Sequence, residues 1–294
     1  MKFKKIAVIG VGTMGSQIAE MLSRIGNYEV NISDSDSKLV DKGCRLIEQN
    51  LESFYVAKGK ISSEEKKRVI HRIKKCRNID EAASNADFII EAVFENLDLK
   101  KDVFQRLDKS APPGTILATN TSMQNISEIA ASTARPELVV GMHFFNPVAV
   151  MKLVEVIRGA HTSDRTIETT CALARKLDKE PVVCRDSSYG FLANRAYNSL
   201  LNEAVQMVWE RVASPADIDK ALRLGYNFPK GPLELFDFTG AWAHLAASEA
   251  ESINKIGPEK GRLHPLLKMM VSAGYVGGKG QKGIYDFWND VLSK

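Results

Sequence analysis

The sequence near the N-terminus reads Ile6-Ala7-Val8-Ile9-Gly10-Val11-Gly12-Thr13-Met14-Gly15. Its apolar run predicts a buried strand, and its G-x-G-x-x-G spacing predicts a tight turn into a helix. Gly10 permits the turn, Gly12 lets the backbone approach a diphosphate, and Gly15 lets the helix pack closely on the strand. The N-terminus of that helix, at Thr13 and Met14, would offer free N–H groups to the anion. These residues therefore predict a turn that binds a dinucleotide.

An acidic residue stands at the expected distance beyond this turn. A second apolar run, Glu29–Ser33, ends at Asp34, close to the separation of about 20 residues that a ribose-binding carboxylate has from the glycines. Asp34 would accept hydrogen bonds from the adenosine ribose hydroxyls and would repel a 2′-phosphate, and the nearest downstream base is Lys38. The pattern predicts NAD rather than NADP as cofactor. The alternative is that the glycines form an ordinary strand–helix turn.

The composition is that of a folded globular protein. Of 294 residues, 44% are hydrophobic and 26% are charged, which excludes a disordered chain, a disulfide-stapled miniprotein and a collagen-like repeat. At about 100–200 residues per domain, the length predicts two domains. No apolar run approaches the roughly 20 residues of a membrane-spanning helix. The basic Met1–Lys5 leads directly into the glycine turn, so we expect it to belong to the fold and not to a targeting segment.

The cysteines carry no metal-binding pattern. Cys44, Cys76, Cys171 and Cys184 are scattered and form no C-x-x-C pair. We expect buried free thiols, no metal site and a reducing compartment, the cytoplasm.

Short apolar runs alternate with amphipathic stretches over the first part of the chain. The predicted strands are Lys5–Gly10, Glu29–Ser33, Asp87–Val93, Thr115–Thr119, Leu138–Phe144, Met151–Ile157 and Glu180–Cys184. The predicted helices are Met14–Ile25, Lys38–Ala57, Leu97–Lys109 and Ser163–Lys176. Since β-branched strands separated by helices form βαβ units, we expect an α/β fold with a Rossmann-type, mostly parallel sheet.

The pattern becomes almost continuously helical from residue 190 to about residue 223. One predicted helix face is marked, at i, i+4 spacing, by Leu192, Ala196, Leu200, Ala204 and Val208. Ser214-Pro215 predicts a helix N-cap followed by proline at the first helical position. We therefore expect the α/β domain at residues 1–186 and an all-helical C-terminal domain at residues 187–294.

Four polar residues stand where the strands of such a fold would end: Ser122, His143, Glu155 and Asn194. Ser122 lies just past one predicted strand, His143 lies near the end of the next, and Asn194 lies near the start of the first long helix. In open α/β sheets, ligands bind beyond the carboxyl ends of the strands. These positions are therefore candidates for chemistry.

Glu155 is the most informative of the four because it lies inside the apolar run Met151–Ile157. Burying a carboxylate is costly unless a partner meets it, and His143 on the preceding strand is the nearest plausible partner. Such a pair makes a general base, because the carboxylate fixes the imidazole tautomer and stabilises the imidazolium that forms. The alternative is an outward-facing glutamate and a core histidine. The dinucleotide motif favours the base, since hydride transfer needs one.

Positive charge is concentrated in one segment. Residues 58–77 contain nine Lys or Arg and two Glu, a local charge of +7, whereas the whole chain carries +4. Such a patch suits a single anionic ligand better than a nucleic-acid groove, which needs a longer stripe with aromatic residues. We expect no nucleic-acid partner. A solvated helix face on a surface projection is the alternative that the sequence leaves open.

Several motifs occur together along the chain: Asn120-Thr121-Ser122, His143-Phe144-Phe145-Asn146-Pro147, Met151-Lys152-Leu153-Val154-Glu155-Val156, Gly190-Phe191-x-x-Asn194-Arg195, Pro229-Lys230-Gly231-Pro232-Leu233-Glu234-Leu235 and Gly283-Ile284-Tyr285-Asp286-Phe287. In this combination the sequence resembles the L-3-hydroxyacyl-CoA dehydrogenases, and most nearly the stand-alone 3-hydroxybutyryl-CoA dehydrogenases, over essentially its whole length. The resemblance implies an NAD-dependent oxidoreductase of fatty acid metabolism that interconverts L-3-hydroxyacyl-CoA and 3-oxoacyl-CoA. The length implies the form without a fused hydratase.

The resemblance also implies roles for the four polar residues. His143 would take the proton of the C3 hydroxyl, and Glu155 would pair with it. Ser122 would hydrogen-bond the reacting oxygen near the nicotinamide, and Asn194 would help to hold or polarise the substrate near its reacting carbonyl.

Further contacts follow from the same resemblance. Besides the glycine turn and Asp34, the positions that match cofactor contacts are Glu95, Lys100, Ser122, Asn146 and Lys279. The segment from Asn50 to Lys60 resembles the helix and turn that receive coenzyme A, which would give Asn50, Lys58 and Lys60 a role in binding the substrate together with Ser122 and Asn194. The helical domain is rich in large apolar residues, namely Trp209, Phe228, Phe236, Phe238 and Trp242. These residues form the domain's own core or, as the resemblance implies, in part a homodimer interface.

The sequence departs from the family pattern at a few positions. Ser188-Tyr189 stands where the family usually has proline before the Gly-Phe motif, and Met123 replaces a small residue beside Ser122. These changes concern the acyl chain length more than the reaction. Two other functions are weighed against this one: a related NAD-dependent dehydrogenase of a free hydroxy acid or sugar acid, without CoA, and an NAD-binding protein that is not an enzyme.

Overall fold

The computed structural model describes residues 3–186 and 190–293. Contacts between Cα atoms divide the chain into two compact units, Met1–Leu192 and Ala193–Lys294. The sequence placed the boundary after residue 186, whereas the first unit extends further because Phe191 is buried in a hydrophobic cluster on its sheet. Ser188 and Tyr189, the expected departures from the family pattern, lie outside the described residues.

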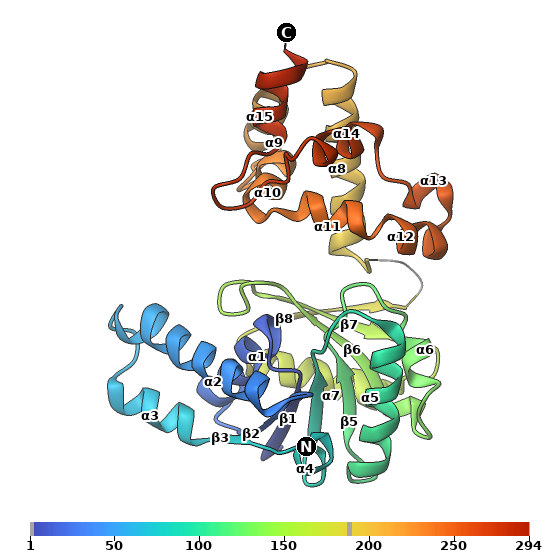
Figure 1. Ribbon diagram of the computed structural model, residues 1–294. Coiled ribbons are helices and arrows are strands. Elements are labelled where there is room, and N and C mark those ends of the chain that lie inside the picture. Colours follow the sequence, from blue (N-terminus) through green and yellow to red (C-terminus); the bar gives the residue numbers. More distant parts are fainter. Residues whose placement is uncertain (1–2, 187–189, 294) are drawn as a thin grey trace. The chain divides into compact units, whose positions relative to one another are not determined.

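The first unit is built on a sheet. Its described strands are β1 (Lys5–Ile9), β2 (Glu29–Ser33), β3 (Ile73–Lys75), β4 (Phe88–Glu91), β5 (Ile116–Thr119), β6 (Val139–Phe144), β7 (Leu153–Arg158) and β8 (Glu180–Arg185). They lie in the order β3-β2-β1-β4-β5-β6-β7-β8 (Figure 1). The pair β6–β7 is antiparallel and the other neighbouring pairs are parallel. The predicted α/β fold with a Rossmann-type, mostly parallel sheet is confirmed.

Both faces of the sheet are buried at its central strands, whereas the edge strands β3 and β8 are largely exposed. In β1, Ile6 and Val8 join one hydrophobic cluster, whereas Ala7 and Ile9 join a second cluster. Since successive side chains of a strand point to opposite faces, the two clusters lie on the two sides of the sheet. A strand that is covered on both sides reads as a continuous apolar run, which is what the sequence has before the glycines.

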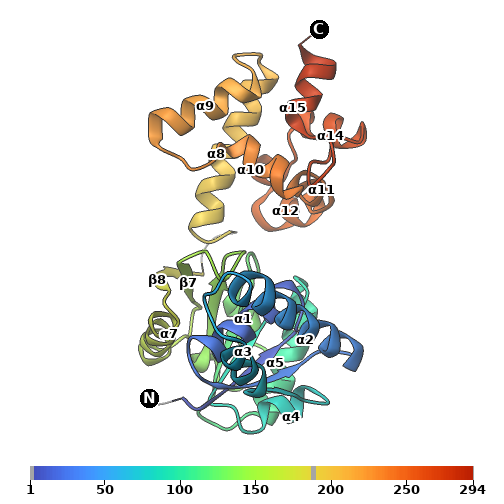
Figure 2. The same cartoon turned by 90° about the vertical axis from the view of Figure 1, so that its left-hand side faces the viewer.

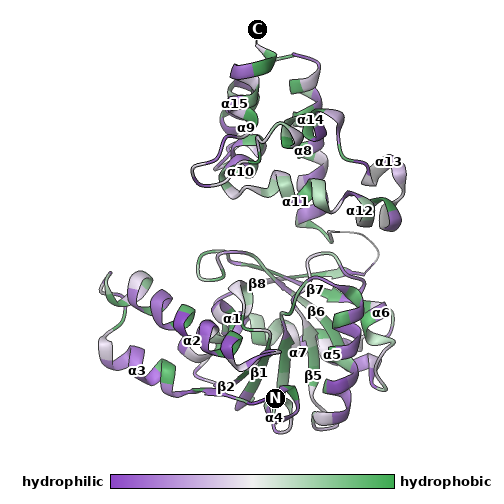
Figure 3. Cartoon of the chain, viewed as in Figure 1, coloured by the Kyte–Doolittle hydropathy of each residue, from purple (hydrophilic) through white to green (hydrophobic). Residues whose placement is uncertain are grey.

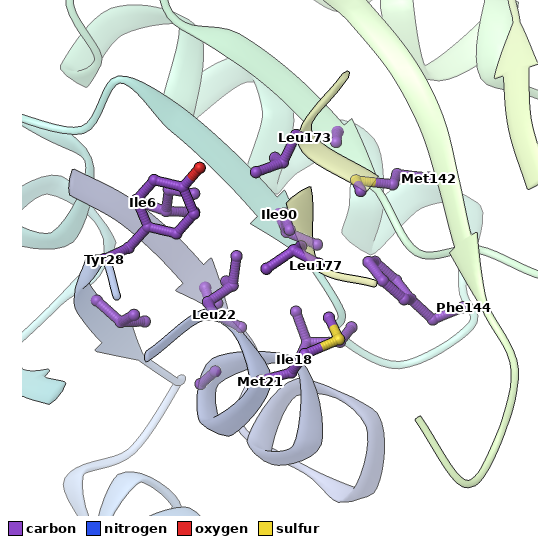
Figure 4. Packing of buried hydrophobic residues seen from close by; sticks show 14 of the residues in the cluster. Ile6, Ile18, Met21, Leu22, Tyr28, Ile90, Met142, Phe144, Leu173 and Leu177 are labelled. Atoms are coloured by element: carbon purple, nitrogen blue, oxygen red, sulfur yellow. The ribbon is translucent and has the colours of Figure 1, made fainter. Parts of the chain in front are cut away.

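Helices cover the two faces of the sheet. Those that contribute to the cluster around Ile6 are α1 (Thr13–Arg24), α2 (Ser37–Leu51), α3 (Ser63–His71) and α7 (Asp164–Lys176). Those that contribute to the cluster around Ala7 are α4 (Ile79–Ala83), α5 (Leu97–Ser110) and α6 (Ile126–Ala130). Figure 4 shows Ile18 and Leu22 of α1 beside Ile90 of β4. This packing fixes α1, and with it the glycine turn, on the sheet.

The predicted helix Lys38–Ala57 is wrong at its C-terminal end. α2 stops at Leu51, and a π-helical turn, Glu52–Val56, follows it. The turn buries Tyr55, whose ring centroid lies 4.0 Å from Cζ of Arg24 in α1. That contact comes from another element, so the hydrophobic period of α2 alone does not predict it.

The basic segment 58–77 is not a single helix face. It contains α3, and it ends in β3, which pairs with β2 at the edge of the sheet. Acidic residues from outside the segment compensate part of its charge: Lys66 Nζ lies 2.7 Å from Glu52, and Lys75 Nζ lies 2.6 Å from Asp41. The local charge of +7 therefore overstates the field of this surface. Figure 3 colours α3 largely as hydrophilic.

The described elements of the second unit are helices and helical turns (Figure 2), so the predicted all-helical character is confirmed. The helices are α8 (Ala193–Trp209), α9 (Pro215–Tyr226), α10 (Pro232–Thr239), α11 (Ala241–Ala247), α12 (Glu249–Ile256), α13 (Pro258–Gly261), α14 (Pro265–Ser272) and α15 (Ile284–Phe287), followed by a π-helical turn at Trp288–Leu292. The Ser214 side chain caps α9 by accepting from the N–H of Asp217, and Pro215 is its first residue, as predicted.

The predicted apolar face of the first long helix is wrong in part. The buried face of α8 consists of Leu201, Ala204, Val205 and Val208, whereas Leu192 precedes the helix and is 47% exposed. A run at constant i, i+4 spacing drifts by about 40° per step around a helix of 3.6 residues per turn. Five such residues therefore cannot share one buried stripe.

The large aromatic residues of the second unit divide between core and surface. Trp242 is fully buried and Phe236 packs against the same core. Phe238 is 70% exposed, and Trp209 and Phe228 are also exposed.

Among the residues that the structure describes, no helix combines the length and apolar character needed to cross a membrane.

Candidate active site

The glycine turn connects β1 to α1 as predicted. The N–H of Gly10 donates to the carbonyl of Ser33 at the end of β2, with 2.8 Å between N and O. A Cβ atom at Gly15 would lie 1.8 Å from the carbonyl oxygen of Gly10. A side chain at this position would push α1 away from β1, which accounts for the third glycine of the motif.

The start of α1 has the features that a diphosphate needs. A Cβ at Gly12 would have no atom within 4 Å, so this glycine leaves open space rather than fitting against the protein. Among the described residues, no side chain caps α1. The N–H groups at Thr13 and Met14 therefore remain available to an anion. The turn fits the diphosphate of NAD.

Asp34 stabilises the turn and keeps further capacity to accept hydrogen bonds. Its Oδ2 accepts from the N–H of Val11 at 2.7 Å, and its Oδ1 accepts from the N–H of Ser35 at 2.7 Å. Oδ1 also accepts from the hydroxyl of Ser35 at 3.3 Å, whereas Oδ2 keeps a second acceptor site, so Asp34 can also receive a ribose hydroxyl. The carboxylate therefore fits the adenosine ribose of NAD.

His143 and Glu155 form a buried pair. They are register partners on β6 and β7, and Nδ1 of His143 lies 2.8 Å from Oε2 of Glu155. The side chains are 5% and 0% exposed. Directly opposed residues of an antiparallel pair point to the same face of the sheet, so the strand register brings the two groups together. The second oxygen, Oε1, accepts from the N–H of Leu192 at 3.1 Å.

Ser122 completes a chain of three side chains. Its Oγ lies 3.1 Å from Nε2 of His143. A carboxylate only accepts hydrogen bonds, so Nδ1 of His143 carries a proton toward Glu155, and Nε2 is the ring nitrogen that can exchange a proton on the side of the serine. The arrangement can take a proton at Nε2 from a hydroxyl group placed beside Ser122.

Apolar groups surround the imidazole. The ring centroid of Phe145 lies 4.5 Å from that of His143, and the centroid of Phe191 lies 6.0 Å from it.

Burial, with Glu155 and Asp186 nearby, raises the pKa of the Cys184 thiol to about 11. This thiol is therefore protonated at neutral pH and is not a competing nucleophile.

Glu95 holds the loop that carries Ser122. Its Oε1 accepts from the backbone N–H groups of Ser122 and Met123, each at 3.1 Å, and from the hydroxyl of Thr121. The carboxylate is 38% exposed, so it can also be reached by a cofactor. The position of the Ser122 hydroxyl depends on this carboxylate.

Glu95 contacts a buried ion pair, which Lys100 forms with Glu91. Nζ of Lys100 is 2.8 Å from Oε1 of Glu91 and 3.5 Å from Oε2 of Glu95, and Lys100 and Glu91 are 1% and 0% exposed. Glu91 also accepts from the hydroxyl of Thr119 at 2.6 Å and from the N–H of Val93 at 2.7 Å. The ammonium group of Lys100 thus contacts both Glu91 and Glu95, and Glu95 in turn holds the loop that carries Ser122.

Asn146 lies in the loop that follows β6. It is exposed, and its Oδ1 accepts from Nε2 of Gln17 in α1 at 3.1 Å. The buried ammonium group of Lys179 holds the same loop, because it donates to the carbonyl oxygens of Val148 and Met151. The loop is thus tied to α1, the helix that begins at the glycine turn.

Two predicted site residues belong to the second unit. Asn194 is the second residue of α8, and Lys279 lies in the glycine-rich segment before Gly283. Their roles stay predictions.

The three residues expected to bind CoA lie at the end of α2 and just beyond the π-helical turn. Asn50 is half-buried, and Lys58 and Lys60 are exposed. Among the described residues, neither lysine has an ion pair. Nζ of Lys58 lies 5.4 Å from the ring centroid of Phe54, and Nζ of Lys60 lies 6.0 Å from that of Tyr55. The two ammonium groups are free to meet an anion.

The sequence did not indicate Glu91, Thr121 or Gln17 as part of the site. Glu91 ends an apolar strand and resembles Glu155 in this respect, so the cost of burying its charge could have pointed to a partner such as Lys100. Thr121 and Gln17 have no comparable signal, since uncharged polar side chains are common in loops and at the start of helices.

Comparisons with known proteins identify the family of this chain. Residues 5–187 match the model of the 3-hydroxyacyl-CoA dehydrogenase NAD binding domain, and residues 190–287 match the model of the C-terminal domain of the same family. A probable 3-hydroxybutyryl-CoA dehydrogenase of Bacillus subtilis is 44% identical over 98% of both chains. A 3-hydroxybutyryl-CoA dehydrogenase of Clostridioides difficile is 42% identical over 96% of this chain and 99% of its own. The crystal structure of (S)-3-hydroxybutyryl-CoA dehydrogenase from Ralstonia eutropha covers 97% of this chain and 99% of its own, at 36% identity and a TM-score of 0.88.

Proposed function

Since this chain belongs to the 3-hydroxyacyl-CoA dehydrogenase family and is an NAD-dependent enzyme, we propose that His143 is its general acid and base. Glu155 is the partner of the imidazole, and Ser122 is the hydrogen-bond partner of the reacting oxygen. The observation that supports this assignment is the contact of 2.8 Å between Nδ1 of His143 and Oε2 of Glu155, which leaves Nε2 directed at Ser122.

The oxidation of a 3-hydroxyacyl-CoA needs a base at the C3 hydroxyl. NAD, when bound, supplies the acceptor for the hydride of C3. Nε2 of His143 takes the hydroxyl proton, and the positive charge that forms on the ring is stabilised by the carboxylate of Glu155. In the reverse direction the imidazolium returns this proton to the oxygen. The hydroxyl of Ser122 donates to that oxygen and keeps it within reach of Nε2.

Glu95, Lys100 and Asn146 contribute to cofactor binding in this proposal, together with Asp34 and the residues of the glycine turn. Lys100 acts through Glu91 and Glu95, because its ammonium group is buried on these carboxylates. Asn194 and Lys279, from the second unit, hold the substrate carbonyl and the cofactor. Residues 1–186 would then form the NAD-binding domain, and residues 187–294 the domain for substrate and dimerisation.

The substrate that we propose is a short-chain L-3-hydroxyacyl-CoA, with 3-hydroxybutyryl-CoA as the first candidate. Two relatives over 40% identical are named for this substrate. The ammonium groups of Lys58 and Lys60, which have no ion pair with a described residue, offer positive charge to the phosphates of CoA, while the Asn50 side chain lies on the same segment.

The proposal is tested by steady-state kinetics with acetoacetyl-CoA and its longer homologues, with NADH and NADPH side by side. We expect NADH oxidation, fastest with the four-carbon substrate and much slower with NADPH. Equal turnover of free acetoacetate would contradict the role of CoA and favour an enzyme that acts on free hydroxy acids. Absence of turnover with every acyl-CoA would contradict the substrate class.

We also propose that the enzyme is a cytoplasmic homodimer. Three large side chains of the second unit, Leu224, Tyr226 and Phe238, are each at least 70% exposed, and apolar surface of this kind favours association. Light scattering tests the dimer, and a monomer at micromolar concentration would contradict it.

The proposed cytoplasmic location rests on the four cysteines, which are free thiols and suit a reducing compartment. Fractionation of the source cells tests the location.

A further inference from the structure

One side chain of α1 joins the dinucleotide helix to the loop after β6. Gln17 is half-buried. Its Nε2 donates to the carbonyl oxygen of Thr13 at 3.0 Å and to Oδ1 of Asn146 at 3.1 Å. Its Oε1 accepts from the N–H of Val148 at 2.9 Å. Both ends of the amide are therefore used, and each end has a backbone partner.

These backbone partners determine which end of the glutamine amide is which. The N–H of Val148 can only donate, so the atom that faces it must be the oxygen of Gln17. The carbonyl of Thr13 can only accept, so the atom that faces it must be the nitrogen. Oxygen and nitrogen of an amide are otherwise hard to distinguish, but here two independent partners require the same orientation.

The orientation of Gln17 determines that of Asn146. Because Gln17 presents an N–H, the atom of Asn146 that faces it must be the oxygen. The amide nitrogen of Asn146 then points away from Gln17. Among the described residues, this nitrogen has no hydrogen-bond partner. Asn146 follows His143 by three positions in the sequence, so the chain presents an oriented donor close to the end of the strand that carries the base.

We propose that Gln17 is a positioning residue that makes Asn146 a hydrogen-bond donor to the carboxamide oxygen of the nicotinamide. The inference rests on the proposed function, in which the ring lies beside His143. The diphosphate and the adenosine ribose already have their partners in the helix N-terminus and Asp34. Of the remaining acceptors on the cofactor, the carboxamide oxygen belongs to the ring that reacts next to the base.

Binding measurements with three ligands test this proposal on the full chain. NADH is titrated by its fluorescence, ADP-ribose is measured by competition, and the 3-acetylpyridine analogue of NADH is titrated in the same way. ADP-ribose has no nicotinamide, and the analogue keeps the carbonyl oxygen but lacks the amide N–H₂. The wild-type protein should bind the analogue within about threefold of NADH, because only the acceptor oxygen is used.

Two variants change the donor. Asn146→Asp replaces the N–H₂ by an oxygen, and Gln17→Glu retains the acceptor for Val148 but makes Asn146 turn its nitrogen inward. Each should raise the Kd for NADH about 5–20-fold more than it raises the Kd for ADP-ribose, in line with the loss of one well-placed hydrogen bond. The ADP-ribose value accounts for the effect of the added negative charge beside Thr13, at the start of α1. Gln49→Glu, on the exposed part of α2, makes the same charge change away from the site and should alter neither value.

Three results would overturn the inference. An equal loss of affinity for NADH and ADP-ribose in Asn146→Asp would place Asn146 on the ribose or the diphosphate. Weak binding of the acetylpyridine analogue to the wild-type protein would mean that the carboxamide donates. A normal Kd for NADH in Gln17→Glu would mean that Gln17 does not control Asn146. The role of His143 is tested separately by turnover, so either proposal can fail while the other stands.

Discussion

His143 and Glu155 are opposed residues of β6 and β7, and the 2.8 Å between Nδ1 and Oε2 follows from that register. The carboxylate thus meets the imidazole through the backbone pairing of two strands and not through a flexible loop. Met142 and Phe144, the neighbours of His143, pack in the cluster on the opposite face of the sheet. The same alternation that builds the core therefore directs the imidazole and the carboxylate to one side.

The first prediction concerns the base. His143→Gln should reduce turnover by about 10²–10⁴-fold, the range for a lost acid–base group, and should leave the Kd for NADH nearly unchanged. Stopped-flow or steady-state rates with acetoacetyl-CoA measure the first, and fluorescence titration measures the second. Near-normal turnover in this variant would remove His143 from the role of base.

The second prediction concerns the partner of the base. Glu155→Gln removes the negative charge that stabilises the imidazolium, so reduction of acetoacetyl-CoA should lose rate at a lower pH than in the wild type. A displacement of about one pH unit corresponds to about 1.4 kcal/mol of lost stabilisation. The pH–rate profiles of both proteins are compared between pH 5 and pH 9. Profiles that coincide would show that the carboxylate does not act on the imidazole.

The third prediction concerns CoA. Reversing charge in Lys58→Glu/Lys60→Glu should raise the KM for acetoacetyl-CoA by about 3–10-fold, since each exposed ion pair contributes little. The KM for acetoacetyl-pantetheine, which lacks the nucleotide phosphates, should stay constant. Lys109→Glu, on α5, is the matched surface control. Equal effects on both substrates would point away from a phosphate contact.

The fourth prediction concerns the buried ion pair. Lys100→Met leaves the carboxylate of Glu91 buried without its cation, so the free energy of unfolding of the first unit should fall by about 3–5 kcal/mol. The double variant Glu91→Gln/Lys100→Met keeps an acceptor for the N–H of Val93 and presents an amide N–H₂ to the hydroxyl of Thr119, which can accept as well as donate, so it should recover part of this loss. The three tryptophans lie at 209, 242 and 288, in the second unit, so hydrogen exchange of the first unit is the suitable probe. A double variant less stable than the single one would contradict the account.

The fifth prediction concerns pH and stability. Glu20 of α1 is buried, and burial raises the pKa of its carboxyl above the usual 4.5 although Arg24 lies beside it. Between 4.5 and the raised value the folded chain binds more protons than the unfolded chain, so this group makes the protein less stable as the pH rises through that window. The stability of the wild type relative to Glu20→Gln should therefore fall from pH 4.5 upward and then level off. A rise in relative stability over that range would give the opposite sign.

Much of the fold was predictable because it follows from local patterns. The apolar run before Gly10, the glycines and Asp34 have fixed spacings, and Ser214-Pro215 has a fixed meaning at a helix start. The apolar surroundings of Glu155 also led to His143, since a buried carboxylate needs a partner. Each of these inferences uses residues close in sequence or a cost that a single residue reveals.

The rest depends on contacts between distant parts of the chain. The strand β3 is short and carries two lysines, so the sequence contains no apolar run that would predict it. Its pairing with β2 is what makes this segment a strand. The anchoring of Ser122 by Glu95 and of Glu95 by Lys100 joins a loop, a helix and a second loop. The orientation of Asn146 depends on Gln17, which lies far from it in the sequence. Such links become visible only when the topology is known.

The antiparallel pairing of β6 with β7 also limits which sequence changes this protein can tolerate during evolution. A shift of one residue between these strands would turn Glu155 into the apolar cluster and would turn Val154 and Val156 to the side that holds His143, so folding and proton transfer would be lost in the same event. The connecting segment between Phe144 and Leu153 is held by different contacts, since Gln17 contacts Asn146 and Val148, and Lys179 contacts Val148 and Met151. Sequence changes in this segment are therefore limited by α1 and by Lys179, and not by the strand register.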